Sequence, residues 1–102
     1  MEALLSELGP IEITGYFSPF HRNDQPWLVQ MQDSSDYWLL IFSSVNALEY
    51  HCEKMGMTEY KIKHIDDGFD FIQSVREGGV RIMANPYFIN GKTRWTEVLL
   101  EN

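Results

Sequence analysis

The stretch DDGFDFIQSVREGGVRIMANP, residues Asp66 to Pro86, predicts a helix that is followed directly by a strand. Asp67 is placed to cap the helix, and Asp70 follows three residues later. Apolar residues recur on one helical face, at Phe69, Ile72 and Val75. Gly78-Gly79 then ends the helix, and an apolar strand is expected to stop at Pro86, which has no amide hydrogen to donate. The stretch therefore specifies a scaffold more clearly than a chemistry.

Upstream of this stretch, two β-prone runs and a helix are predicted. The runs Trp27 to Gln32 and Tyr37 to Phe42 flank a short polar segment, which favours a hairpin. The second run is apolar without alternation, as in a strand that is covered on both faces. Ser43 or Ser44 caps the following helix, Gly56 is placed to end it, and its apolar stripe comprises Val45, Leu48, Cys52 and Met55.

The remaining segments before the second helix have weaker patterns. Glu2 to Leu8 favours one or two helical turns, which Gly9-Pro10 would end. Ile11 to Phe17 and Thr58 to Ile65 alternate between apolar and polar residues, as half-buried strands do. Ser18 to Pro26 is polar and contains two prolines, which is typical of a loop.

The tail is open to two interpretations. Asn90-Gly91 between two β-prone triplets is a hairpin signal. Against it, Trp95, Val98 and Leu99 lie at helical spacing after Thr93, a possible N-cap. We favour the closing helix from Arg94 to Leu100.

Together these elements predict one α+β domain over residues 1–102. We expect a mostly antiparallel or mixed sheet of about five strands, with two main helices packed on one face. The length suits a single hydrophobic core.

The charge of the chain makes some partners unfavourable. The formal net charge is −7, and the first half is almost devoid of cations. Phosphate backbones and anionic membranes repel such a chain, so neither nucleic acid nor a membrane is an expected partner. No signal peptide or apolar span is visible, and the lone Cys52 suits a reducing compartment, so we expect a cytoplasmic protein.

The order of landmarks resembles a known family. A hairpin ends in Leu40-Ile41-Phe42-Ser43-Ser44, a helix with Ala47 follows, and a later strand ends in Ala84-Asn85-Pro86. This order resembles the SseB-like N-terminal domain family over roughly Trp27 to Leu99. Tyr87 replaces the glycine that often follows Asn-Pro in that family. The resemblance implies a binding or accessory role, and no site residues are transferred.

One cluster of ionisable residues could support acid–base chemistry. His64, Asp66 and Asp67 are close in sequence, and a carboxylate can orient an imidazole. A structural role is the better interpretation, because Asp67 explains the helix cap and Asp66 favours the helix dipole. The spacings of His21, His51 and His64 do not suit a metal site, and we predict no catalytic residue, metal or cofactor.

Aromatic residues are the better functional candidates, because they exceed what one small core can bury. The first hypothesis is a non-enzymatic binding or accessory protein, a homodimer or homo-oligomer that uses a patch around Tyr87, Phe88 and Trp95. The second is a small-molecule-binding protein or enzyme with a pocket. Trp27 and Trp38 would form its walls, and His64 and Asp66 would supply its ionisable groups. The third is an acidic inhibitor or immunity-type protein that masks a basic partner.

Overall fold

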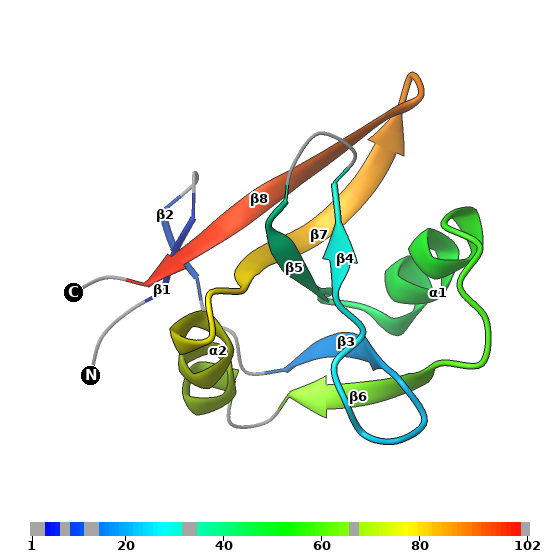
Figure 1. The fold of residues 1–102 in the computed structure, drawn as a ribbon. Coiled ribbons are helices and arrows are strands. Elements are labelled where there is room, and N and C mark those ends of the chain that lie inside the picture. The colour runs from blue at the N-terminus through cyan, green and yellow to red at the C-terminus, as the bar shows by residue number, and fades with distance from the viewer. Residues whose placement is uncertain (1–3, 7–8, 12–14, 32–34, 66–67, 101–102) are drawn as a thin grey trace.

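The described residues form a single α+β domain with two helices, which confirms the predicted fold class (Figure 1). The computed structural model describes residues 4–6, 9–11, 15–31, 35–65 and 68–100. In chain order the elements are β1 (Leu4–Ser6), β2 (Gly9–Ile11), β3 (Tyr16–Phe20), β4 (Val29–Gln30), β5 (Tyr37–Ile41), α1 (Val45–Lys54), β6 (Lys61–Ile65), α2 (Gly68–Glu77), β7 (Arg81–Ile89) and β8 (Lys92–Leu100).

The strands form a mixed six-stranded sheet and a two-stranded sheet. The larger sheet has the order β2-β1-β8-β7-β5-β4, in which only the neighbours β5 and β7 are parallel. The smaller sheet pairs β3 with β6 in antiparallel register. Phe17 and Phe42 exchange two backbone hydrogen bonds of 2.7 and 2.8 Å, which join β3 to the end of β5.

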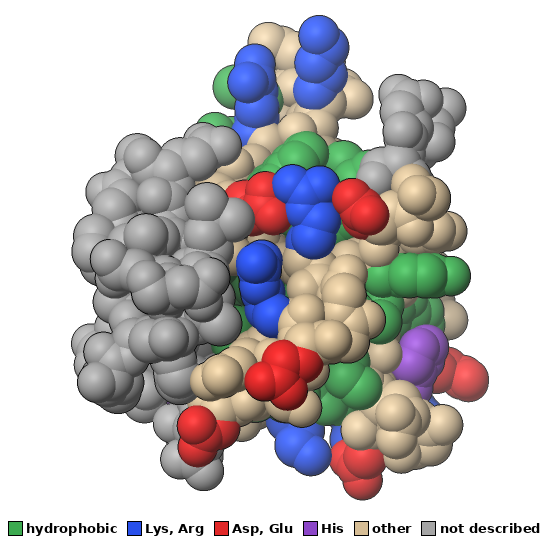
Figure 2. Space-filling model, turned by 60° about the vertical axis from the view of Figure 1, so that its left-hand side comes forward, with side chains coloured by type: hydrophobic (Ala, Val, Ile, Leu, Met, Phe, Trp, Pro, Cys, Tyr) green, Lys and Arg blue, Asp and Glu red, His purple; other side chains and the backbone are tan. Residues whose placement is uncertain are grey.

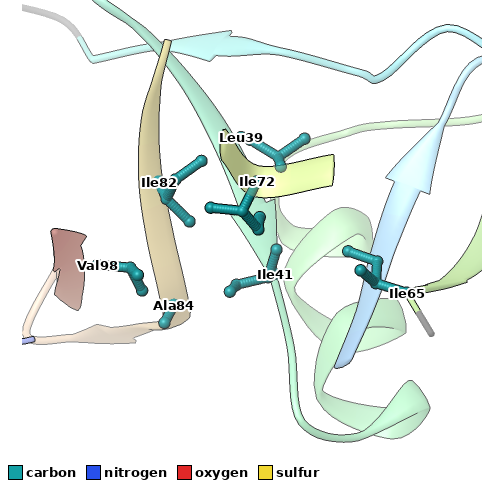
Figure 3. Packing of buried hydrophobic residues seen from close by; sticks show 7 residues of the cluster. All are labelled: Leu39, Ile41, Ile65, Ile72, Ile82, Ala84 and Val98. Carbon is teal, nitrogen blue, oxygen red and sulfur yellow. The ribbon is translucent and has the colours of Figure 1, made fainter. Parts of the chain in front are cut away.

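Strand β5 is covered on both faces, as its unbroken apolar run predicts. Leu39 and Ile41 belong to one buried cluster with Ile72 of α2, whereas Leu40 belongs to a second cluster with Leu48 of α1. Figure 3 shows seven residues of the first cluster, drawn from β5, β6, β7, β8 and α2. Because neighbouring strand residues point to opposite faces, the two helices lie on opposite sides of the sheet.

The predicted placement of both helices on one face is therefore wrong. When only one face of a sheet is covered, polar residues alternate with apolar ones along each strand, because the other face meets water. Strand β5 has no polar residue after Tyr37. Two apolar faces require two covering layers. One helix covers each face, with the β3–β6 pair contributing residues to both clusters.

The helix ends follow the sequence signals. Ser44 caps α1 by accepting a 3.1 Å hydrogen bond from the Ala47 amide. At the other end, Gly56 adopts φ of 72°, and the Met57 amide donates to the Cys52 carbonyl at 2.9 Å. This is the glycine-terminated ending predicted for α1. Asp67, the predicted cap of α2, lies outside the described residues.

The tail is a strand, so the predicted closing helix over Arg94–Leu100 is wrong and the hairpin alternative is confirmed. Asn90 and Gly91 have φ values of 51° and 75°, as a tight hairpin turn between β7 and β8 requires. The apparent helical spacing of Trp95 and Val98 has another cause. Residues three apart point to opposite faces of a strand, and both faces of β8 are covered.

Two further predictions for the first strands are corrected or extended. The expected leading helix is wrong, because Leu4–Ser6 forms β1 and pairs with the end of β8. A strand is predicted over Ile11 to Phe17, of which residues 12–14 lie outside the described part. The observed strand β3 begins at Tyr16 and continues beyond the predicted end, to Phe20. No helix in the described part of the chain is long and apolar enough to cross a membrane.

Candidate functional site

The second half of the β7–β8 hairpin leaves the main sheet. Pairing between β5 and β7 ends at Ala84, and a bulge follows between Ala84 and Tyr87. Beyond the bulge, residues 87–89 pair only with residues 92–94. We call these six residues and their turn the ribbon. Figure 1 shows the ribbon extending past the ends of β4 and β5.

Asn85 sets the direction in which the ribbon leaves the sheet. Its backbone has φ of 49°, a left-handed conformation that asparagine tolerates better than most residues. Its side-chain Oδ1 accepts hydrogen bonds from the Ser43 amide at 2.9 Å and the Ser43 hydroxyl at 3.2 Å. Pro86 follows at the bulge, where no ladder hydrogen bond is needed. Strand β7 continues to Ile89, so the prediction that it stops at Pro86 is wrong.

The two faces of the ribbon differ. On the inner face, the ring of Phe88 stacks on His51 of α1, with centroids 4.6 Å apart and an interplanar angle of 6°. Tyr87 and Ile89 alternate with Phe88 and therefore point to the outer face. They are 55% and 49% exposed. Their cross-strand partners are Arg94 and Lys92, respectively.

An open groove lies on the inner side, between the ribbon, α1 and the β4–β5 hairpin. Its volume is about 1010 Å³. Its apolar lining residues come from five segments: Val29 and Met31 around β4, Trp38 and Leu40 of β5, Met55 after α1, Met83 and Phe88 of β7, and Trp95 of β8. We call this hollow the groove.

An ion-paired arginine lines the groove. Arg81 donates to both carboxylate oxygens of Glu97, at 2.6 and 2.7 Å, and to Asp36 at 3.1 Å. The hydrogen bonds from Arg81 to Glu97 raise the pKa of the guanidinium further. The Arg81 Cζ lies 4.3 Å from the centre of the Trp38 ring, which is a cation–π contact. Arg81 thus covers one face of Trp38.

Two buried polar atoms of groove residues have no hydrogen-bond partner. They are Trp38 Nε1 and His51 Nδ1, and each residue is only 3% exposed. Burial lowers the pKa of His51, which favours its neutral form. The edge of Trp38 packs against Trp95, with centroids 5.5 Å apart. Buried polar atoms in folded proteins usually have a partner, so this pair distinguishes the groove from ordinary core.

The structure brings some predicted site residues together and separates others. Trp38, Trp95 and Phe88 meet at the groove, whereas Tyr87 lies on the outer face of the ribbon. Trp27 stacks on His21 at 4.2 Å and is not part of the groove lining.

His64 is exposed and lines a separate, smaller hollow, where its ring lies 4.9 Å from that of Phe17. Asp66 lies outside the described residues. The described residues of the expected tryptophan and histidine pocket therefore do not share one cavity.

Cys52 is fully buried in the cluster beneath α1, as predicted. Burial raises the pKa of its thiol to about 11, which keeps the sulfur protonated and weakly nucleophilic near neutral pH. In the described part of the chain, no three His, Cys, Asp or Glu residues are grouped as metal ligands would be.

The roles of His51 and Asn85 are not among those predicted from the sequence. His51 lies three residues after Leu48 and beside Cys52 on the buried side of α1, a spacing that indicates a core residue. Asn85 precedes a proline, which in sequence predicts only the end of a strand. Its left-handed backbone and its bond to Ser43, 42 residues away, leave no local signal in the sequence.

Charged side chains of both signs are interspersed across the face shown in Figure 2. Among the described residues, Asp24 pairs with Lys61 and with Lys63, and its hydrogen bond from Lys61 lowers the pKa of the Asp24 carboxyl.

No family model, curated protein or solved structure matches this chain. The resemblance to the SseB-like N-terminal domain family therefore stays a prediction.

Proposed function

We propose that this chain is a non-enzymatic binding protein that works as a homodimer, and that the outer face of the ribbon forms the dimer contact. The observation that carries the proposal is the exposure of Tyr87 and Ile89 on a ribbon of only two strands. Two-stranded ribbons are marginally stable in water on their own. The inner face is supported by α1, and a second copy would support the outer face.

The outer face is suited to packing against a copy of itself. Strand β7 contributes Tyr87 and Ile89, and strand β8 contributes Arg94 and Lys92 directly opposite them. Neither cation has an ion-pair partner among the described residues. A two-fold axis that lies between the two ribbons and runs parallel to their strands places the apolar row of each copy over the cationic row of the other. Arg94 would then lie over the Tyr87 ring of the second copy.

Two features favour binding over catalysis at this end of the molecule. The single thiol of the chain is buried and protonated, which makes it a poor nucleophile. The exposed imidazole of His64 lines a hollow separate from the groove. A binding or accessory role is also what the resemblance to the SseB-like family implies.

Amide hydrogen exchange across a range of protein concentrations tests the proposal. The amides of Tyr87 to Arg94 should exchange at least tenfold more slowly in concentrated than in dilute solution, because the second copy suppresses opening of the ribbon. The amides in the middle of α1 serve as the internal reference. Arg94→Ala should reduce this concentration dependence, whereas Lys54→Ala, which removes an exposed cation from α1, should leave it intact.

Exchange of the ribbon amides at the same rate at all concentrations would contradict the proposal. So would an equal effect of the two alanine variants, because the contact would then not depend on the outer face of the ribbon.

A further inference from the structure

We propose that the groove is a binding site for a planar aromatic molecule that carries a carbonyl oxygen, such as an aromatic amide. This inference goes beyond the proposed dimer, because it concerns the inner side of the ribbon. The carbonyl oxygen would accept a hydrogen bond from Trp38 Nε1, and the ring would pack against the aromatic side chains of the groove.

The need for an acceptor follows from Trp38. Its indole N–H can only donate a hydrogen bond. The N–H has no partner, although the residue is only 3% exposed. His51, which also lines the groove, has an unpartnered Nδ1 as well. An unpaired buried donor is unfavourable, and a bound carbonyl would relieve that cost. Two such atoms in one groove are a second observation beyond the shape of the hollow.

The need for a planar ring follows from the walls. One face of Phe88 is stacked on His51, and the side chain is still 36% exposed, which leaves ring surface free for a ligand. Trp95 presents a half-buried indole to the same space. A volume of about 1010 Å³ is ample for one drug-sized molecule. Stacked or edge-to-face contacts with these rings favour an aromatic ligand over an aliphatic one.

The ligand can reach Trp38 Nε1 only if neighbouring side chains shift. Met31, Met55 and Met83 line the groove, and methionine is unbranched and adapts readily to new surroundings. Met55 is 40% exposed and can move into solvent. The lining is therefore compatible with a site that is completed when the ligand enters.

Titration of ¹⁵N-labelled protein with naphthamide tests the inference, with ethylnaphthalene as the matched probe that lacks an acceptor. The indole N–H signals of the three tryptophans report on the site directly. We expect naphthamide to shift the Trp38 signal downfield and to leave that of Trp27, outside the groove lining, nearly unchanged. Naphthamide should bind roughly threefold to tenfold more tightly than ethylnaphthalene, as one neutral hydrogen bond predicts.

The variant Trp38→Phe keeps an aromatic ring and removes the donor, so it should abolish the preference for naphthamide over ethylnaphthalene. If this variant does not fold, the signals of the wild-type protein decide alone. Equal affinities for naphthamide and ethylnaphthalene, or a shift confined to Trp27, would each overturn the inference. Dimer formation is read separately from the ribbon amides.

Discussion

At the scale of single residues, His51 connects the core to the ribbon. Its ring lies between those of Phe42 and Phe88, at centroid distances of 5.6 and 4.6 Å. The stack holds the inner face of the ribbon against α1. Because the imidazole is buried and its Nδ1 lacks a partner, the stack tolerates the neutral ring and disfavours the charged one.

This environment predicts a pH-dependent stability. The pKa of His51 is lowered from its ordinary value of 6.5 in the folded protein, so the unfolded chain takes up the proton first as the pH falls. The free energy of unfolding should therefore decrease as the pH drops below about 6.5. His51→Phe keeps a stacking ring and removes the titration. We expect its gain in stability over the wild type to be larger near pH 5 than near pH 8.

Urea denaturation at both pH values measures this effect. His51→Gln is the control at the same site, because it also removes the titration but loses the ring stack. It should flatten the pH dependence and be less stable than His51→Phe at both pH values. A wild-type stability that is unchanged between the two pH values would show that protonation of His51 carries no folding cost.

At the scale of elements, much of the secondary structure could be predicted from local signals. The Ser44 cap and the Gly56 ending of α1 are encoded within a few residues of each terminus. The strand β8 could not be predicted in the same way. Trp95 and Val98 face two different buried clusters, so their spacing imitates a helical stripe. Only the structure shows that both sides of this strand are covered.

The bulge at Asn85 is the element on which the candidate site depends. Asn85→Ala removes the acceptor for both Ser43 hydrogen bonds and places alanine in a left-handed conformation. We expect a loss of about 1–3 kcal/mol in the free energy of unfolding. Asn85→Asp retains an acceptor and a residue that tolerates this conformation, so it should lose less.

Thermal denaturation of both variants and the wild type checks this prediction. Equal stabilities for the alanine and aspartate variants would indicate that the Ser43 contacts do not hold the bulge. In that case the direction of the ribbon would have to be set by the turn at Asn90-Gly91 instead.

At the scale of the whole molecule, the sequence indicates the fold class and misses the placement of the helices. The apolar run from Trp38 to Phe42 already implies a strand with two covered faces. Assigning one helix to each face would have followed from that observation. The groove itself was not predictable. Its lining residues come from β4, β5, β7, β8 and α1, which are far apart in the chain.

The candidate site was predicted in part. Aromatic residues near the tail were singled out, and Phe88 and Trp95 do meet Trp38 at the groove. Tyr87 points the other way because strand neighbours alternate, which the expected patch of Tyr87, Phe88 and Trp95 did not take into account. The ribbon therefore has two surfaces with separate proposed roles, a dimer contact outside and a ligand site inside.

Sedimentation velocity over a series of protein concentrations tests the central claim, dimer formation through the outer face of the ribbon, most directly. The wild type should sediment as a dimer at high concentration, and a double variant with Tyr87→Ser and Ile89→Ser should remain a monomer. Tyr50→Ser, which changes a tyrosine of similar exposure on α1, should behave as the wild type. A wild type that stays monomeric at every concentration, or a double variant that dimerises as well as the wild type, would contradict the account.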